Sequence, residues 1–497
     1  MGWMPRKIPR LLWLALPLAY FLYLYHLEAA GLLGPDEQRY AAVARDMART
    51  GYWVTPRLWG QPWFEKPALL YWMTAAGFRL GLGPELAPRL PVALMALGFL
   101  GFYWWILRRE FGPTAAWLAA LMLGTCAGWV GFSQVGVTDL PLAATFSAAM
   151  LLSLPWIAKG DVRWLPAASA LLGLAVLAKG LVPLVLALPL LMRGRIRDLI
   201  RWRVVVPFCV IALPWYVLCY LRNGRTFVDV FFGQQTFARF FSAELLHGQP
   251  WWFYLPVLLA GLLPWTPLVG LVARRRALRD PRRAFLLVWF LFGLLFFSLA
   301  ANKLPGYLLP LLPALTALMG IGLDEVEHPA PWLAASAVLL VTFPMVAPAL
   351  PAAVATGLSR TPWPAPSWIW LLPVAAAAAV WMVAQQGRRL AAVALMAACI
   401  AAGFVYLKHS TMPEVNRAAS ARSLWSEIET RAGEVCVAAI HRNWRYGLNY
   451  YSVTPLPDCE QQPRPLAVRQ TVGQPPHVAA ALVERSVPGG IIAPFRN

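Results

Sequence analysis

Two short polar segments between the first two hydrophobic stretches hold the residues whose types and spacing best suit chemistry. They read Pro35-Asp36-Glu37-Gln38-Arg39-Tyr40 and Phe64-Glu65-Lys66-Pro67. Asp36 and Glu37 are adjacent acids, and partial burial beside a second acid raises a carboxyl pKa toward the range of a general base. The alternative is that they complement a helix dipole, for which one carboxylate suffices. We predict that Asp36 and Glu37 are catalytic.

The second segment places a carboxylate beside a lysine. Lys66 offers a compact charge for a phosphate, with Glu65 orienting it or binding a metal. The alternative is a local ion pair at a helix start. His247 precedes Gly248-Gln249-Pro250 and would complete a two-residue metal site with Glu65. Two ligands are few for a metal ion, so a divalent metal is a minor expectation.

Further polar residues stand at the ends of later hydrophobic stretches. Lys179 lies between two short apolar segments, where a lysine is costly unless it has an anionic partner, and a phosphate or Asp139 would serve. Lys303 and Tyr307 stand at the mouth of another stretch, where the alternative to substrate binding is interfacial anchoring. We expect Asp139, Lys179, Lys303 and Tyr307 to line a cavity with the first two segments.

Composition identifies a membrane protein. Of the 497 residues, 59% are hydrophobic and 13% are charged, and apolar runs near the length of a membrane span recur along the chain. The net charge of +20 comes from basic residues in short scattered turns, which is typical of cytoplasmic loops. These residues do not lie along one face of the protein, so we expect no nucleic-acid partner. No glycine-rich phosphate loop is present, so we expect no nucleotide cofactor.

The apolar runs predict an all-α polytopic protein with about thirteen transmembrane helices. We place them near 11–30, 88–107, 114–132, 140–158, 164–178, 180–192, 204–222, 252–272, 284–300, 305–322, 331–350, 367–384 and 390–407. With this count every basic cluster falls on one side, which the positive-inside rule makes cytoplasmic. The candidate residues then fall outside, where mixed acids, lysines and a tyrosine indicate an active site at the outer membrane face.

The chain divides into a membrane domain over 1–408 and a small external α/β domain over 409–497. The first external loop, 31–87, should contain interfacial helices, one following Pro35 and one running from Pro67 to Arg79. In the external domain a strand is expected over 435–440 and a helix after His441. Cys436 and Cys459 lie there, in an oxidising compartment, and we expect them to form a disulfide.

Taken in order, the segments around Asp36, Glu65, Asp139, Lys179, His247 and Lys303 to Tyr307 resemble the landmarks of the bacterial ArnT-like glycosyltransferases, relatives of the protein O-mannosyltransferases. The resemblance implies a GT-C fold and transfer of 4-amino-4-deoxy-L-arabinose from undecaprenyl phosphate to lipid A phosphates at the periplasmic face of the bacterial inner membrane. It implies that Asp36 is the catalytic acid and that Glu65 and His247 are linked to a metal. It also implies that Arg39, Lys66 and Tyr307 lie near the carrier phosphate, and that Asp139 and Lys179 are further polar positions at the cavity. We also predict that Tyr40 and Lys303 bind substrate.

Three alternatives stay open at this point. A related polyprenyl-phosphate-sugar transferase would act on another surface glycan or on protein hydroxyls. A lipid-linked sugar transporter would place its ionisable groups near the membrane midplane and show internal repeats, neither of which the sequence displays. A scaffold or lipid-sensing protein would leave the clustering of acids and lysines unexplained.

Overall fold

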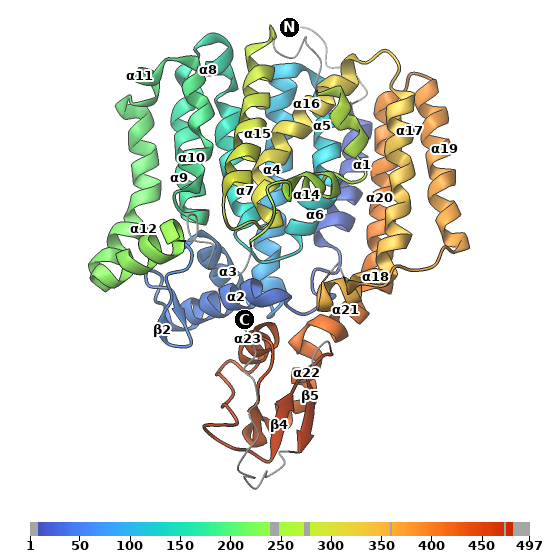
Figure 1. The fold of residues 1–497 in the computed structure, drawn as a ribbon. Helices are drawn as coiled ribbons and strands as arrows, with labels where there is room; N and C mark the ends of the chain where they lie inside the picture. Colours follow the sequence, from blue (N-terminus) through green and yellow to red (C-terminus); the bar gives the residue numbers. More distant parts are fainter. Residues whose placement is uncertain (1–7, 239–247, 273–278, 358–359, 472–473, 481–497) are drawn as a thin grey trace.

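The protein is a long helical bundle with a small mixed domain at one end (Figure 1). The structure is a computed structural model that describes residues 8–238, 248–272, 279–357, 360–471 and 474–480. Within these residues, nine helical segments are long and apolar enough to cross a membrane. They are α4 (Leu86–Phe111), α7 with α8 (Asp139–Leu152 and Leu154–Lys159), η2 with α9 (Val162–Trp164 and Leu165–Lys179), α12 with η4 (Trp202–Val228 and Asp229–Ala238), α15 (Pro281–Leu299), η7 with α16 (Pro305–Leu311 and Leu312–Glu325), α17 through η8 to α18 (Ala330–Val338, Leu339–Val341 and Thr342–Thr356), η10 with α19 (Trp368–Trp370 and Leu371–Gln385) and α20 (Arg389–Ser410).

The remaining predicted stretches form shorter or broken helices. They are α1 with η1 (Ile8–Ala19 and Tyr20–Leu24), α5 with α6 (Pro113–Thr125 and Ala127–Ser133), α10 with η3 (Val182–Leu186 and Leu188–Arg193) and α14 with η5 (Tyr254–Gly261 and Thr266–Leu271). The pair α5 and α6 bends by 57° and makes a tenth candidate span. The continuous helix expected over 252–272 is broken, because Pro264 and Pro267 lack the N–H that would continue it.

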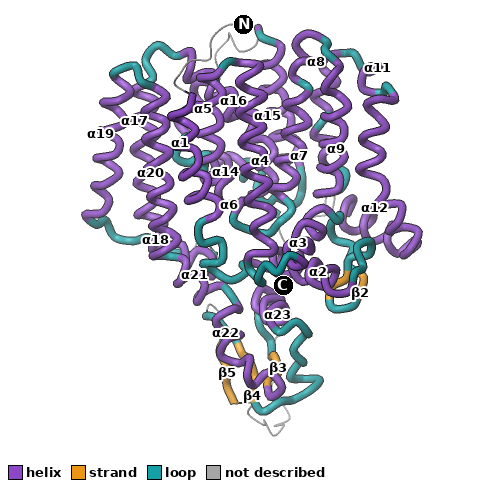
Figure 2. The backbone as a smooth tube through the Cα atoms, turned by 180° about the vertical axis from the view of Figure 1, so that it is seen from behind, coloured by secondary structure: helices purple, strands orange, loops and turns teal. Residues whose placement is uncertain are grey.

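The basic turns meet at one end of the bundle. Arg282 donates to the carbonyl of Glu110, Arg283 pairs with Glu325, and Arg389 donates to the carbonyls of Leu323 and Asp324. On the same side, Arg193 donates to the carbonyl of Ile157 at the end of α8, and α11 (Ile196–Leu199) lies beside it (Figure 1). The small mixed domain lies at the opposite end (Figures 1 and 2).

Two helices lie across that opposite end, α2 (Gly34–Thr50) and α3 (Leu69–Arg79). Both expected helices are therefore present, with Pro35 in the first turn of α2. Between them, β1 (Arg57–Leu58) and β2 (Gln61–Pro62) form an antiparallel hairpin with Trp59 and Gly60 at its turn. Trp59 has a φ of 49°, a strained value for a residue with a side chain.

The small domain after α20 is a three-stranded sheet with helices. Helices α21 (Met412–Ala419), α22 (Ala421–Ile428), η11 (Glu429–Glu434) and α23 (Arg442–Tyr451) accompany strands β3 (Val435–Val437), β4 (Leu466–Arg469) and β5 (His477–Ala480). Strand β4 pairs in parallel with β3 and antiparallel with β5. The expected strand and the helix after His441 are both observed, and Cys436 and Cys459 form the expected disulfide.

One buried ion pair fixes α2 against the bundle. Arg89 of α4 and Glu37 of α2 are both almost completely buried. The guanidinium of Arg89 donates to both oxygens of Glu37, at 2.8 and 3.0 Å, and to the carbonyls of Leu27, Ala30 and Gly31. These five bonds use all five N–H groups of an arginine. The Glu37 oxygens also accept from the amides of Leu33 and Gly136.

Removing one partner of this pair is expected to destabilise the end of the bundle that carries α2 and α3. Arg89→Ala leaves a buried carboxylate without its cation, which costs about 3–5 kcal/mol. The exposed pair Arg431 and Glu434, 2.7 Å apart, is a matched control whose loss should cost no more than about 1 kcal/mol. The measurement is the melting temperature of the purified protein in detergent for Arg89→Ala and Arg431→Ala. Equal melting temperatures for the two variants would contradict this role for Arg89.

Candidate functional site

The side chains that could take part in a reaction gather at the end of the bundle that carries α2 and α3. They form two groups. The first, which we call the Arg39 cluster, contains Asp36, Arg39, Glu65 and Lys66. The second, the Asp139 pair, contains Asp139 and Lys179 with the ring of Tyr307 beside them. Both groups come from segments that the sequence predicted to be polar landmarks.

In the Arg39 cluster one arginine contacts two carboxylates. Arg39 Nη2 pairs with Asp36 one turn before it on α2, and it lies 3.3 Å from a Glu65 oxygen in the loop before α3. Lys66 Nζ lies 3.4 Å from the other oxygen of Glu65. Burial alone would lower the pKa of Arg39, but the carboxylates of Glu65 and Asp36 outweigh it and raise that pKa. The guanidinium therefore stays charged at every physiological pH.

The two acids of the cluster differ in access. The side chain of Asp36 is 47% exposed, whereas that of Glu65 is 3% exposed. A group that must exchange a proton with a substrate has to be reachable, and Asp36 is. Glu65 is buried and lies close to Tyr40, whose phenol is also buried. Burial and the nearby Glu65 carboxylate raise the pKa of Tyr40, so its hydroxyl remains protonated.

Glu37, the second acid of the predicted catalytic pair, points the other way. It is 1% exposed and holds the ion pair with Arg89 described above. All the bonds of its carboxylate are to groups that fix the backbone of α2 and the loop before α7. The structure therefore does not bring Glu37 together with Asp36, and its contacts are those of a positioning residue.

The Asp139 pair joins three separate helical segments. Asp139 begins α7 and Lys179 ends α9, and Lys179 Nζ donates to Asp139 Oδ1 at 2.6 Å. The same ammonium lies 4.7 Å from the centre of the Tyr307 ring in η7. Gly306 makes room for this arrangement, because a Cβ there would lie 2.5 Å from Asp139 Oδ1. The anionic partner that the sequence required for Lys179 is thus Asp139.

An aromatic cluster lies between the two charged groups. Phe64, which precedes Glu65, packs with Leu177, which lies two residues before Lys179. Phe227 stands edge-on to Phe64, with ring centres 5.3 Å apart, and stacks on Phe231. Phe231 also approaches Gly180. The loop bearing Lys66 and the end of α9 bearing Lys179 are therefore held by one apolar core.

Lys303 does not join these groups. The ammonium of Lys303 is buried and donates to the carbonyls of Ala300 and Gln249, at 2.7 and 3.1 Å. It thereby ties the loop before η7 to the residues after 247. His247 itself lies outside the described residues. Among those that are described, no group of three or more His, Cys, Asp or Glu side chains is placed to hold a metal ion.

Sequence reasoning missed one member of the site, Tyr446 of α23. The guanidinium carbon of Arg39 lies 5.2 Å from the centre of the Tyr446 ring and 5.7 Å from that of Trp63. Trp59 in the hairpin turn stacks on Tyr446, with 5.7 Å between ring centres and 14° between planes. The small domain thus contributes an aromatic wall to the Arg39 cluster. An aromatic residue in a helix far along the chain gives no sequence signal for such a contact.

Three buried donors of this wall have no hydrogen-bond partner among the described residues. They are Nε of Arg39 and the indole N–H groups of Trp59 and Trp63. A buried donor without an acceptor costs about 1–3 kcal/mol. Such donors beside a charged arginine suit a ligand rich in oxygen, as a phosphate or a sugar is.

The sequence matches characterised families over part of its length. Residues 65–220 match the model of dolichyl-phosphate-mannose-protein mannosyltransferases. An undecaprenyl phosphate-alpha-4-amino-4-deoxy-L-arabinose arabinosyl transferase of Erwinia tasmaniensis is 34% identical over 364 residues, which are 69% of this chain and 64% of that protein. The enzyme of the same name from Pseudomonas aeruginosa is 34% identical over 63% of this chain and 60% of its own length. The chain spans between about half and two thirds of the curated relatives it matches.

Solved structures agree over nearly the whole chain. ArnT from Cupriavidus metallidurans bound to undecaprenyl phosphate superposes with a TM-score of 0.76 and 27% identity, covering 94% of this chain and 87% of that one. Its apo form gives a TM-score of 0.73. The oligosaccharyltransferase AglB from Archaeoglobus fulgidus, at 13% identity and a TM-score of 0.50, shares the fold alone.

The aromatic wall gives a testable interaction. Tyr446→Ala removes the ring that faces Arg39, and cation–π contacts of partly buried groups contribute about 0.5–2 kcal/mol. We expect Tyr446→Ala to lower the melting temperature and Tyr446→Phe, which keeps the ring, to leave it unchanged. In an Arg39→Met background, Tyr446→Ala should cost less than it does alone. A purely additive double variant would show that Arg39 and Tyr446 do not interact.

Proposed function

We propose that this chain, which is ArnT-like in sequence and has the GT-C fold, is an integral membrane glycosyltransferase that takes a sugar from a polyprenyl phosphate carrier. The donor class follows from the relatives, whose names specify undecaprenyl phosphate-linked aminoarabinose, and from the ArnT structure bound to undecaprenyl phosphate. The observation that carries the proposal is that cations and an accessible carboxylate share one end of the bundle. The sugar we assign is 4-amino-4-deoxy-L-arabinose and the acceptor a lipid A phosphate.

The cations suit the leaving group. As the bond between the sugar C1 and the carrier phosphate oxygen breaks, the polyprenyl phosphate gains negative charge, and preorganised cations stabilise it. Lys66 pairs with the carboxylate of Glu65, and Lys179 pairs with that of Asp139. An arriving phosphate can share these ammonium groups with the carboxylates. Arg39, held by its aromatic wall, offers a third cation and Nε as a donor.

Asp36 is assigned the role of base or cation stabiliser. An acceptor oxygen attacks C1 of the sugar, the C1–O bond to phosphate breaks, and the carrier phosphate leaves with the electron pair. When the acceptor is a hydroxyl its proton passes to Asp36, whereas a phosphate acceptor is already an anion and has little need of a base. In either case the carboxylate of Asp36 faces the developing positive charge of the sugar. Tyr40 lies close to Glu65 and stays a neutral phenol.

The membrane topology is part of the proposal. We assign thirteen spans, with the basic turns in the cytoplasm and both the site and the small domain (409–497) in the periplasm of a bacterial inner membrane. In support, the basic turns and the small domain lie at opposite ends of the bundle (Figure 1). Each of the thirteen predicted stretches also has a helical counterpart, although four are short or broken.

The divalent metal remains a prediction from sequence. Glu65 forms ion pairs with Arg39 and Lys66, and His247 lies outside the described residues. No step of the proposed reaction is assigned to a metal. If Glu65 and His247 hold a divalent ion, dialysis against a strong chelator should abolish transfer, and Mn²⁺ or Mg²⁺ should restore it. Transfer that continues after dialysis would contradict the predicted metal.

Asp36→Asn tests the carboxylate and the acceptor class together. We expect transfer to a lipid A phosphate, followed as release of polyprenyl phosphate, to fall about 100-fold or more in kcat, since general-base and electrostatic groups each contribute on that scale. Asp46→Asn on the same helix is the control and should keep full activity. A hydroxyl acceptor should lose more than a phosphate acceptor if Asp36 removes a proton. Equal loss with both acceptors would assign cation stabilisation instead, and an unchanged kcat would remove Asp36 from catalysis.

Lys179→Gln tests the phosphate role of the Asp139 pair. Loss of one charge-assisted contact to the donor should weaken donor binding about 10- to 100-fold, because such contacts contribute about 1.5–3 kcal/mol. The affinity for undecaprenyl phosphate is the measurement. The double variant Asp139→Asn with Lys179→Gln removes both charges. Any loss of affinity in it then comes from the missing ammonium and not from a carboxylate left without its cation. Normal affinity in the double variant would place the phosphate elsewhere.

A further inference from the structure

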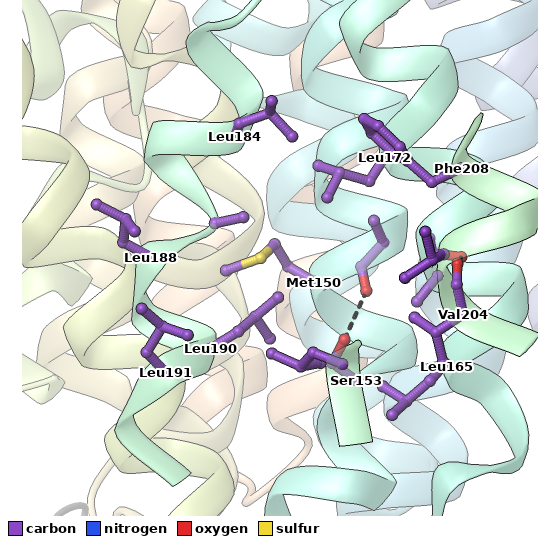
Figure 3. Close-up of a pocket in the computed structure, with 16 residues that line it drawn as sticks. Met150, Ser153, Leu165, Leu172, Leu184, Leu188, Leu190, Leu191, Val204 and Phe208 are labelled. Carbon is purple, nitrogen blue, oxygen red and sulfur yellow. Dashed lines mark hydrogen bonds between the residues drawn. The ribbon is translucent and has the colours of Figure 1, made fainter. Parts of the chain in front are cut away.

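A cavity lies far from the charged groups, toward the basic end of the bundle. It has a volume of about 310 Å³ and is lined by α7, α9, α10, η3, α11 and the start of α12 (Figure 3). Met150 and Ser153 line it, and they stand 11 and 14 residues beyond Asp139 along α7 and its continuation. At 1.5 Å per residue the cavity is roughly 15–20 Å from the Asp139 pair.

The wall of this cavity is apolar. Its lining is made of leucine, valine, alanine, methionine and phenylalanine with two serines. The serine hydroxyls are already used, since Ser153 donates to the carbonyl of Ala149 and Ser169 to that of Val204, at 3.0 and 2.6 Å. Among the described residues the wall therefore offers a ligand no spare hydroxyl donor. A cavity of this kind suits a hydrocarbon chain and not a sugar or a water cluster.

The cavity borders a strongly basic segment of the chain. Residues 193–203 contain five arginines and one aspartate, and Leu199 and Val204 of the wall stand within and beside that segment. Asp198 is committed to Arg201, at 2.8 Å, and to the indole of Trp156. Arg193 and Arg195 lie over the turn that ends α8, because a Cβ at Gly160 would meet both guanidinium groups. Arg195 and Arg201 are exposed.

Apolar side chains surround these arginines. Trp202, Ile200 and Met192 are more than half exposed. Exposed aromatic and aliphatic groups interleaved with arginines are typical of the headgroup level of a membrane. Basic residues next to a hydrophobic recess are also the usual setting for anionic lipid headgroups.

We propose that this cavity is a binding site for an anionic phospholipid, with one acyl chain in the cavity and the headgroup phosphate at Arg195 and Arg201. The charge of the segment selects an anionic headgroup over a zwitterionic one, and the apolar wall holds the chain. The site is separate from the Arg39 cluster and the Asp139 pair. It stands whether or not the transferase proposal holds, because no residue of either group takes part.

Native mass spectrometry of the detergent-purified protein tests this site. Phosphatidylglycerol and phosphatidylcholine with identical acyl chains are added separately, and undecaprenyl phosphate is added as a competitor. We expect phosphatidylglycerol to bind at least about 10-fold more tightly than phosphatidylcholine. Arg195→Gln with Arg201→Gln should reduce that preference to about 2-fold or less. Arg388→Gln, an exposed arginine at the same end near α20, is the matched control and should keep it.

A second variant tests the acyl chain. Ala187→Phe places a ring inside the cavity and should reduce the binding of both lipids about equally, and Ala168→Leu serves if Ala187→Phe does not fold. Equal binding of the two lipids by the wild-type protein would overturn the proposal. So would unchanged phosphatidylglycerol binding in a folded cavity variant, or displacement of the lipid by stoichiometric undecaprenyl phosphate, which would make the cavity part of the donor site.

Discussion

The buried pair of Arg89 and Glu37 is the constraint on which the site end of this protein depends. An arginine and a glutamate removed from water are costly unless every hydrogen-bonding group is used. Here all five guanidinium N–H groups have acceptors, and the carboxylate also receives two backbone amides. The bonded backbone groups belong to the end of the first hydrophobic segment, to the entry of α2 and to the loop before α7. One charge pair therefore sets the positions of both Asp36 and Asp139.

The same constraint explains why two adjacent acids have different roles. Successive residues of a helix point about 100° apart, so the face of α2 that carries Glu37 into the bundle turns Asp36 toward the surface. Arg39, one turn later, follows Asp36 and meets Glu65 from the loop before α3. The buried acid fixes the helix, and the exposed acid is the one we propose for the reaction. A single carboxylate at this helix start could not fill both roles.

Local patterns in the sequence predicted much of this end of the molecule. The proline and acids at the start of α2, the segment from Pro67 to Arg79, and the requirement that Lys179 have an anion all depend on neighbours in the chain or on simple electrostatics. The pairing of Glu37 with Arg89, 52 residues apart, and of Arg39 with Tyr446, more than 400 residues apart, depends on tertiary packing and has no local signal. The break near Pro264 was missed because hydropathy counts apolar residues and ignores the missing N–H of proline.

The docking of the small domain is what gives the site a complete wall. Tyr450 and Tyr451 of α23 bond to the carbonyl of Pro84 and the carboxylate of Glu85, just before α4 begins. Arg45 of α2 donates to the carbonyl of Tyr450 and lies over its ring. Because α23 is held by α2 and by the segment just before α4, the ring of Tyr446 lies against Arg39. The arginine is thereby kept between aromatic rings from both parts of the chain. The aromatic surroundings of Arg39 therefore depend on the contact between the small domain and the membrane helices.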